Sequence, residues 1–428
     1  MLGTKKTYFI PIIGFFAIIL FGSFILCSPL CNVAGLSYKD CLFISTSGVT
    51  TTGITKGPLV EQFSFFGQII LALLMEIGAM GFIIFVSYFW SVKHKKMRMS
   101  DIMVINDNIS GDSYSNIKKH SIFICKYMFR VQITGIILLL FSFIPKFGLR
   151  GIWYSIFHTI SAFSNTGFDI FGANSMTMFA GDIYVQLITI ILMLLGSLGI
   201  LVIEDIKDKG FKFKKLKLQT RIVLVYSLVL LAVPTILMKL YDPELTVMNS
   251  LFMASTSRST GFSILPLSGF EFESKFILAV LMFIGGGPTS TSGGIRILTF
   301  AVLLSTVVAT LRGKSETIIA WRTITEETVR RAFTITIVFL LVIFIGSFTI
   351  LHFNDYLNMG DIVFDMISAI SNTGLSLVDA TQIDTVANVV FMVVMFIGRV
   401  GPLTILLSFI KNDNSDKYVK YPIENIVL

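Results

Sequence analysis

Long apolar runs alternate with short polar stretches along the whole chain. A helix needs roughly 20 residues to cross a bilayer. Eight runs reach or approach that length, namely 8–27, 65–90, 133–144, 185–203, 222–240, 276–284, 332–351 and 387–410. The runs 133–144 and 276–284 become spans only with the weakly polar residues beside them. The first run is too long for a signal peptide and lacks a clear cleavage site. The pattern predicts an all-α polytopic membrane protein with eight transmembrane helices.

Four short polar stretches interrupt this pattern in the same way. Each ends in Thr-Gly and follows an amphipathic segment too short to span: YKDCLFISTSGV, GIWYSIFHTISAF, VMNSLFMASTS or GDIVFDMISAI. The apolar run after each stretch carries clustered glycines, as in IGAMG, LGSLG, IGGG and IGRVG. Agreement at both places predicts an internal repeat. We place four span–pore-helix–span repeats at 1–98, 99–217, 218–315 and 316–410, with 411–428 as a C-terminal tail.

The four Thr-Gly stretches have the composition of a cation pathway. Non-helical backbone at membrane depth is tolerated where it is buried in protein or lines water. Stretches that meet on one pseudo-fourfold axis would surround a central pore with carbonyl oxygens, which can replace the water shell of a cation. One copy alone would be read as a turn. The stretches carry no acid, so we do not expect selectivity for divalent ions. The candidate filter residues are Thr51, Thr52, Gly53, Asn165, Thr166, Gly167, Ser259, Thr260, Gly261, Asn372, Thr373 and Gly374.

The second apolar run of the third repeat contains GGGPTSTSGG. Glycine and proline in this density end a helix, and a broken helix at membrane depth must face the pore or a cavity. We therefore expect a flexible loop below the filter, with a static kink as the alternative. The other second runs are not conspicuously broken. The loop residues are Gly285, Gly286, Gly287, Pro288, Thr289, Ser290, Thr291, Ser292, Gly293 and Gly294.

Arg399 lies in the second run of the fourth repeat. An arginine inside a membrane segment is costly and marks a functional position. We expect it to hold the loop shut by bonding its hydroxyls and carbonyls, or to act as an electrostatic barrier to cations. Glu76, in the matching run of the first repeat, is its candidate partner, and a purely structural ion pair is the alternative. We expect Arg258, before the third Thr-Gly stretch, to anchor its short helix rather than to contact ions.

The composition sharpens this picture. The chain of 428 residues is 54% hydrophobic and 14% charged, with a net charge of +8. Basic residues gather in alternate loops, at 93–98, 118–130, 207–217, 312–331 and 411–420. The positive-inside rule places these loops and both termini in the cytoplasm. No aromatic-basic pattern accompanies them, so we expect contact with membrane lipids and no nucleic-acid role.

The chemistry-bearing residues exclude other classes of protein. Four cysteines and four histidines show no metal spacing, and no nucleophile stands with a base. We therefore expect no enzyme and no metal site other than potassium at the filter. A disulfide between Cys27 and Cys31 is conceivable, although small apolar packing is favoured.

On these repeated stretches, the chain resembles the membrane subunits of the Trk/Ktr/HKT potassium transporter superfamily over nearly its whole length. It is most similar to the Ktr-type subunit, because it begins with the first span and lacks an extra N-terminal helix pair. The resemblance implies gated, channel-like potassium uptake across the plasma (inner) membrane, with the glycine-rich loop as gate. The family associates the four glycines with potassium preference and includes sodium-stimulated members.

The resemblance also implies partners. It implies a homodimer and a cytosolic, KtrA-like ring of nucleotide-binding RCK subunits. ATP or ADP would bind that ring, because this chain has no phosphate loop and no cofactor of its own. The segment 312–331 and the tail 411–428 are candidate docking surfaces, with a solvated helix extension as the alternative for each.

Two other classes of function are compatible with parts of this pattern. An ion-coupled secondary transporter, a sodium or proton symporter, would also use repeats and broken helices. It favours inverted repeats and paired discontinuous helices, whereas these repeats run in the same orientation. A membrane enzyme would need a catalytic constellation that the sequence does not show.

Overall fold

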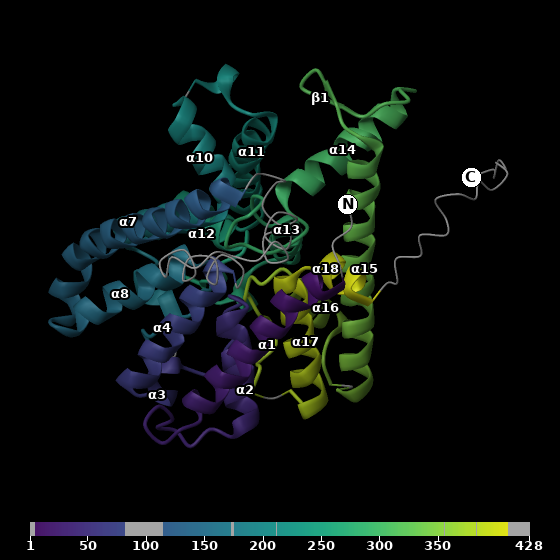
Figure 1. The fold of residues 1–428 in the computed structure, drawn as a ribbon. Coiled ribbons are helices and arrows are strands. Elements are labelled where there is room, and N and C mark those ends of the chain that lie inside the picture. The colour runs from purple at the N-terminus through teal and green to yellow at the C-terminus, as the bar shows by residue number, and fades with distance from the viewer. Residues whose placement is uncertain are drawn as a thin grey trace.

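A computed structural model describes residues 5–81, 114–172, 175–210, 212–354, 356–381 and 383–409. The described part is almost wholly helical (Figure 1). It contains one antiparallel hairpin, formed by β1 (Ile318–Ile319) and β2 (Arg322–Thr323). Part of the predicted run 65–90 and the tail 411–428 lie outside the described residues.

The helices follow one order in each quarter of the chain. A leading helix comes first: α1 (Lys5–Leu26), α7 (Tyr114–Phe147), α11 (Leu218–Tyr241) or α15 (Glu326–Phe353). A short helix follows: α2 (Tyr38–Val49), α8 (Arg150–Phe163), α12 (Val247–Thr256) or α16 (Met359–Ile370). A returning helix comes after the Thr-Gly stretch: α4 (Phe65–Met80), α9 (Ile183–Ser197), α13 (Phe272–Ile284) or α17 (Thr385–Val400). The shorter elements are α3 (Leu59–Gln62), α10 (Ile200–Lys209), α14 (Ile297–Leu311), α18 (Pro402–Phe409) and the 3₁₀ turns η1 (Ser175–Phe179), η2 (Phe213–Lys215) and η3 (Leu267–Gly269).

Polar side chains define where several helices begin. Ser37 and Thr246 cap the short helices α2 and α12, each by accepting a main-chain N–H of the first turn. Ser64, Asp182 and Asp384 do the same for α4, α9 and α17. Such caps satisfy N–H groups that have no partner within the helix. Polar residues between the apolar runs therefore set the starts of two short helices and three returning helices, whereas α8, α16 and α13 begin without a side-chain cap.

Three described helical segments are long and apolar enough to cross a membrane, namely Ile122–Phe147, Leu218–Tyr241 and Glu326–Phe353. The bent pair of α9 and α10 would make a fourth. Shorter apolar helices occupy Pro11–Leu26, Phe65–Met80, Ile297–Leu311 and Thr385–Val400. The protein is thus a helical membrane protein, while eight full spans remain a prediction.

The returning helices correct one expectation. We expected a conspicuous break only in the third repeat, but α9 and α10 meet at 93° around Gly199, which has φ +91°. α4 ends at Gly81 (φ +74°), and Gly401 (φ +92°) separates α17 from α18. Glycine tolerates these backbone angles at little steric penalty. The sequence reasoning failed because isolated glycines are less visible than a run of three.

Packing between the quarters closes a circle. Each returning helix packs against the short helix of the next quarter: α4 on α8, α9 on α12 and α13 on α16. The last returning helix, α17, packs on the first short helix, α2. The buried apolar side chains form two large clusters, one from α1, α2, α4 and α15–α17 and one chiefly from α7–α9 and α11–α13. This circular packing places the four Thr-Gly stretches near a common centre.

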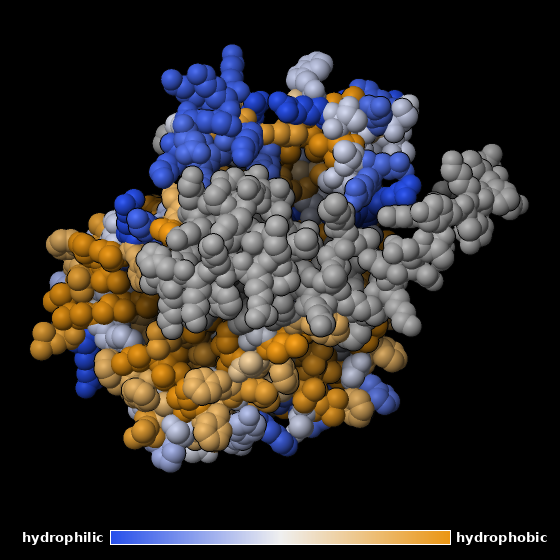
Figure 2. Space-filling model, viewed as in Figure 1, coloured by the Kyte–Doolittle hydropathy of each residue, from blue (hydrophilic) through white to orange (hydrophobic). Residues whose placement is uncertain are grey.

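The surface separates into apolar and charged zones. Figure 2 shows hydrophobic residues over much of the lower body and hydrophilic residues at the top, over α10, the adjoining end of α11 and the hairpin. Large apolar side chains are exposed on the outer helices, including Phe24, Leu228 and Phe348. Such a surface suits a lipid environment. The described residues of the basic segments 207–217 and 312–331 lie on the same side of the molecule (Figure 1).

Candidate cation pathway

The four Thr-Gly stretches form a closed ring. A side chain at Gly53 would overlap the carbonyl oxygen of Thr166, and one at Gly167 would overlap that of Thr260. Gly261 lies in the same way against Thr373, and Gly374 returns to Thr52. The four glycines have φ between +79° and +96°, angles that favour glycine. We call residues 51–53, 165–167, 259–261 and 372–374 the Thr-Gly ring.

The first, second and fourth stretches leave the end of their short helix through the same hydrogen bond, whereas in the third the N–H groups of Thr260 and Gly261 both bond the Thr256 carbonyl. The N–H groups of Thr52, Thr166 and Thr373 bond carbonyls five residues earlier, those of Ser47, Ser161 and Ser368. The hydroxyls of Ser47 and Ser368 also accept the N–H of Gly53 (3.1 Å) and Gly374 (2.9 Å). These bonds satisfy main-chain N–H groups of the stretch. Carbonyl oxygens are then the groups available to a cation.

The residue before Thr-Gly is held in unusual backbone angles. Thr51, Asn165 and Asn372 have φ of +54°, +54° and +49°, and Ser259 has φ +131°. Asn372 donates to Thr52 Oγ1 (3.0 Å) and to the Met395 carbonyl (2.9 Å). These side chains reach neighbouring stretches and helices. The structure thus brings all twelve predicted filter residues together, while what each contributes to binding remains a prediction.

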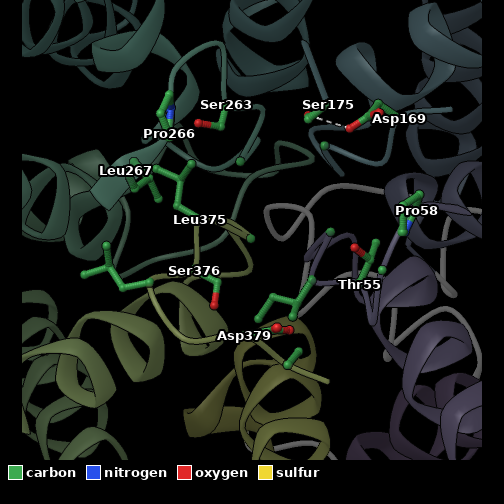
Figure 3. A pocket seen from close by; sticks show the side chains of 18 of the residues that line it. Thr55, Pro58, Asp169, Ser175, Ser263, Pro266, Leu267, Leu375, Ser376 and Asp379 are labelled. Carbon is green, nitrogen blue, oxygen red and sulfur yellow. Dashed lines mark hydrogen bonds between the residues drawn. The ribbon is translucent and has the colours of Figure 1, made fainter. Parts of the chain in front are cut away.

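A cavity of about 540 Å³ opens on one side of the ring. Its lining combines the four ring glycines with the segments that follow them, drawn in Figure 3. Asp169, Ser263, Ser376 and Asp379 place oxygen atoms around it. We call this cavity the mouth. Its polar walls can accommodate a hydrated cation next to the ring.

Asp169 is an acidic residue that lines the mouth. Its carboxylate accepts hydrogen bonds from Ser175 Oγ (2.6 Å) and from the N–H of Phe171 (3.2 Å). Burial raises the pKa of Asp169 to about 6, and these two hydrogen bonds limit the rise. The group therefore changes charge in a range where transport can be measured.

The third returning helix is interrupted between α13 and α14 by residues 285–296. The N–H groups of Ile295 and Arg296 bond the carbonyls of Phe283 and Ile284, each over 3.0 Å. The N–H of Ile297 bonds the Gly286 carbonyl at 2.9 Å. The chain thus leaves and returns at one place, and residues 285–294 form a closed excursion. We call them the glycine-rich loop.

The loop lies against residues that precede the ring glycines, whereas the mouth is lined by residues that follow them. Added side chains at Gly287 and Gly293 would overlap the carbonyls of Leu198 and Ser371. The N–H of Gly287 bonds the Ser197 carbonyl at 2.8 Å. The loop and the mouth therefore lie at opposite ends of the ring.

Two arginines hold the loop by main-chain carbonyls. Arg399 donates to Thr291 O at 2.6 Å and also to Gly78 O. Arg296 donates to Gly287 O at 3.0 Å. The sequence reasoning missed Arg296, although its place directly after the glycine-rich motif was a usable signal. Arg399 thus joins the loop to α4 of the first quarter.

Glu76 is not the partner of Arg399. Its two carboxylate oxygens instead accept from Gln132 Nε2, at 3.0 and 2.9 Å, which links α4 to α7. The prediction was wrong because Arg399 reaches α4 at the main-chain oxygen of Gly78, whereas the Glu76 side chain of the same helix is bonded to α7. Arg258 is buried and donates to Ser227 Oγ at 3.1 Å, which ties the end of α12 to α11. The four cysteines are free.

Comparisons with known proteins identify the family of the chain. The TrkH family model, described as cation transport protein, matches residues 20–421. The chain is 31% identical to Ktr system potassium uptake protein B of Bacillus subtilis, over 96% of this chain and 94% of that protein. It is also 31% identical to potassium/sodium uptake protein NtpJ of Enterococcus hirae, over 97% and 95%.

A solved structure shares the fold. The potassium transporter TrkH from Vibrio parahaemolyticus superposes with a TM-score of 0.77 at 18% identity, covering 96% of this chain and 86% of that one. The family match spans all four Thr-Gly stretches and the glycine-rich loop. With a helical membrane fold, a closed ring of carbonyl-bearing stretches and these relatives, the chain belongs to the TrkH family of cation transport proteins.

Proposed function

We propose that this chain takes up potassium through a gated pore, with the Thr-Gly ring as its filter. The closed cyclic contact of the four stretches carries the proposal. A cation on the axis of such a ring meets uncharged oxygen ligands, which suit a monovalent ion. The short helices α2, α8, α12 and α16 end at the ring, and their negative dipole ends favour a cation beside them. Potassium is the ion that the names of both similar relatives share.

The glycine-rich loop is the proposed gate. It sits at the end of the ring opposite the mouth and is anchored by Arg399 and Arg296 to main-chain oxygens. Charge-assisted hydrogen bonds of this kind are stronger than neutral ones. Their cationic heads also oppose the passage of potassium while they remain in place. Movement of the loop would remove both a steric and an electrostatic obstacle.

The charged end of the molecule is the proposed cytoplasmic side. Segments 207–217 and 312–331 project there, as the positive-inside rule requires. At the hairpin tip Trp321 is 98% exposed, an arrangement that suits docking of a partner. We propose an RCK-type, KtrA-like ring carrying ATP or ADP as that partner, a homodimeric membrane subunit, and both termini in the cytoplasm.

A sodium- or proton-coupled transporter is the second candidate. The 93° bend between α9 and α10, and the glycine breaks at Gly81 and Gly401, supply the discontinuous helices that such transporters use. The relative named potassium/sodium uptake protein also favours a role for sodium. A closed ring is compatible with a role for sodium in which sodium stimulates a conducting pore.

Uptake of rubidium into liposomes holding the purified chain separates the two functions. A pore predicts uptake driven by a negative inside potential alone, with potassium competing. A coupled transporter predicts no uptake until a sodium or proton gradient is imposed. Sodium added equally on both sides tests stimulation, because it supplies the ion without supplying a gradient.

A further inference from the structure

The glycine-rich loop is joined to the Thr-Gly ring at two buried points. The side-chain amide of Asn165 hydrogen-bonds Thr291 Oγ1 at 2.6 Å. The N–H of Gly293 donates to Ser259 Oγ at 2.8 Å. Asn165 and Ser259 are each about 1% exposed, and Thr291 is 6% exposed. The loop is therefore bonded to the ring itself as well as to the surrounding helices.

Asn165 connects the loop to a second ring residue. Its amide also bonds Thr260 Oγ1 at 2.6 Å, and either orientation of the amide keeps both contacts. The main-chain carbonyl of Thr260 is the one against which Gly167 packs. A chain of contacts thus runs from Thr291 through Asn165 to a carbonyl-bearing position of the ring. With its amide occupied on both sides, Asn165 holds the ring by its side chain rather than offering that side chain to an ion.

The four stretches of the ring differ in their side-chain contacts with the glycine-rich loop. The corresponding asparagine of the fourth stretch, Asn372, bonds Thr52 Oγ1 and the Met395 carbonyl. Those partners belong to the first stretch and to α17. The second and third stretches, which are neighbours in the ring, are the ones whose side chains bond the loop. Displacing the loop would therefore remove support from one side of the ring.

Building on the pore function proposed above, we propose that Asn165 is a positioning residue that couples the gate to the filter. The closed loop fixes Asn165 through Thr291, and Asn165 fixes Thr260 in the ring. When the loop leaves, Thr260 loses this support and the ring discriminates less between potassium and sodium. A gate that only blocked the pathway would change the rate of transport and leave selectivity untouched.

Thr291 allows a direct test, because its contact with Asn165 and its contact with Arg399 use different atoms. Its hydroxyl bonds Asn165 and donates to the carbonyls of Gly196 (3.0 Å) and Phe163 (3.3 Å), while its main-chain carbonyl oxygen accepts from Arg399. The double-mutant cycle with Asn165 separates the first of these contacts from the others. Thr291→Val removes the hydroxyl, preserves the shape and leaves the carbonyl for Arg399. Thr291→Ser restores a hydroxyl and is the rescue variant. Asn165→Gly removes the amide, and glycine accepts the backbone angle of φ +54°.

Ions reach the ring from the mouth while the loop is closed, so a double-mutant cycle on the ratio of rubidium to sodium binding at equilibrium, measured on the purified protein with its loop closed, decides the proposal. We expect Thr291→Val and Asn165→Gly each to lower the ratio about threefold or more, and the double variant to fall no further, since residues in one network are not additive. Thr291→Ser should keep the wild-type ratio. Thr289→Val is the matched loop control, because the Thr289 hydroxyl bonds the neighbouring Pro288 carbonyl. Its effect should add to that of Asn165→Gly.

Other outcomes overturn the coupling. If Thr291→Val changes the uptake rate and leaves the binding ratio unchanged, or if the two substitutions act additively on that ratio, the loop and the ring are independent. If Asn165→Gly does not fold, Thr291→Val and its serine rescue decide the question alone. A wild-type protein that does not prefer rubidium to sodium would instead refute the pore function itself, so the two failures are distinguishable.

Discussion

The guanidinium of Arg399 donates to the main-chain oxygen of Thr291, and so joins the last returning helix to the glycine-rich loop of the third quarter. The same guanidinium reaches Gly78 O in α4. One side chain therefore connects three of the four quarters, namely the first, the third and the fourth, at the end of the ring where the loop lies. Any movement of the loop away from the axis must break the first of these bonds.

Arg399→Gln should raise rubidium uptake in the absence of any regulatory partner. The substitution replaces charged donors, whose hydrogen bonds are each worth about 1.5–3 kcal/mol, with a shorter neutral one. We expect a rise of about tenfold, measured in liposomes at a fixed potential. Arg221→Gln is the control, because Arg221 also donates to main-chain carbonyls, those of Leu216 and Lys214, but away from the loop. Equal uptake by the wild type and Arg399→Gln would remove Arg399 from the gate.

Gly199→Ala should displace the glycine-rich loop from the other side. A methyl group at Gly199 would overlap the Pro288 carbonyl, and its φ of +91° strains any other residue. We expect faster rubidium uptake at unchanged protein yield. The control is Gly210→Ala, which has φ +63° but open space around it. Backbone strain of about 1–3 kcal/mol is common to both substitutions. Similar uptake by both variants would show that strain alone accounts for the effect.

Gln132→Leu should destabilise the fold by about 1–3 kcal/mol, because it leaves the Glu76 carboxylate without its hydrogen-bond donor. Gln132 is 5% exposed and donates to both carboxylate oxygens of Glu76. The double variant Glu76→Leu and Gln132→Leu should recover most of the loss, since no polar group is then stranded. Thermal unfolding in detergent gives both values. Equal melting temperatures for the single and double variants would contradict this account of the pair.

Lowering the pH outside should weaken the apparent affinity for rubidium through Asp169. Burial raises the pKa of Asp169 to about 6, so the carboxylate is charged at pH 7.5 and largely neutral at pH 5. Loss of one negative charge from the mouth should raise KM about twofold to tenfold. Asp169→Asn should have a high KM at both pH values.

Asp182→Asn is the matched control for this titration. Burial alone would raise the pKa of Asp182, but hydrogen bonds from Lys146 and the Val185 N–H lower it on balance. That carboxylate therefore stays ionised between pH 7.5 and pH 5, so its removal should leave the pH dependence intact. If the pH dependence of KM survives in Asp169→Asn and disappears in Asp182→Asn, Asp182 rather than Asp169 causes it, which contradicts this account.

The residues of the Thr-Gly ring could be predicted from the sequence, but the side-chain contacts around the ring could not. Repetition of Thr-Gly behind four short amphipathic segments predicted which residues meet, because each stretch is a local pattern. The bonds of Arg399 and Glu76 depend on how the quarters rotate against one another, which no local pattern reports. Asn165 looked like a filter residue by position alone. Its hydrogen bonds to Thr260 and Thr291 join residues far apart in the chain, and they became visible only in the fold.

The central claim is that the four glycines form one selective ring, and Gly261→Ser tests it most directly. A side chain there would overlap the Thr373 carbonyl, whereas one at Gly269 would meet open space, so Gly269→Ser is the control. Rubidium and sodium uptake are measured side by side in liposomes at one potential. We predict that the wild type and Gly269→Ser prefer rubidium and that Gly261→Ser loses this preference while still transporting ions. Unchanged selectivity in a folded Gly261→Ser protein would contradict the ring as the filter.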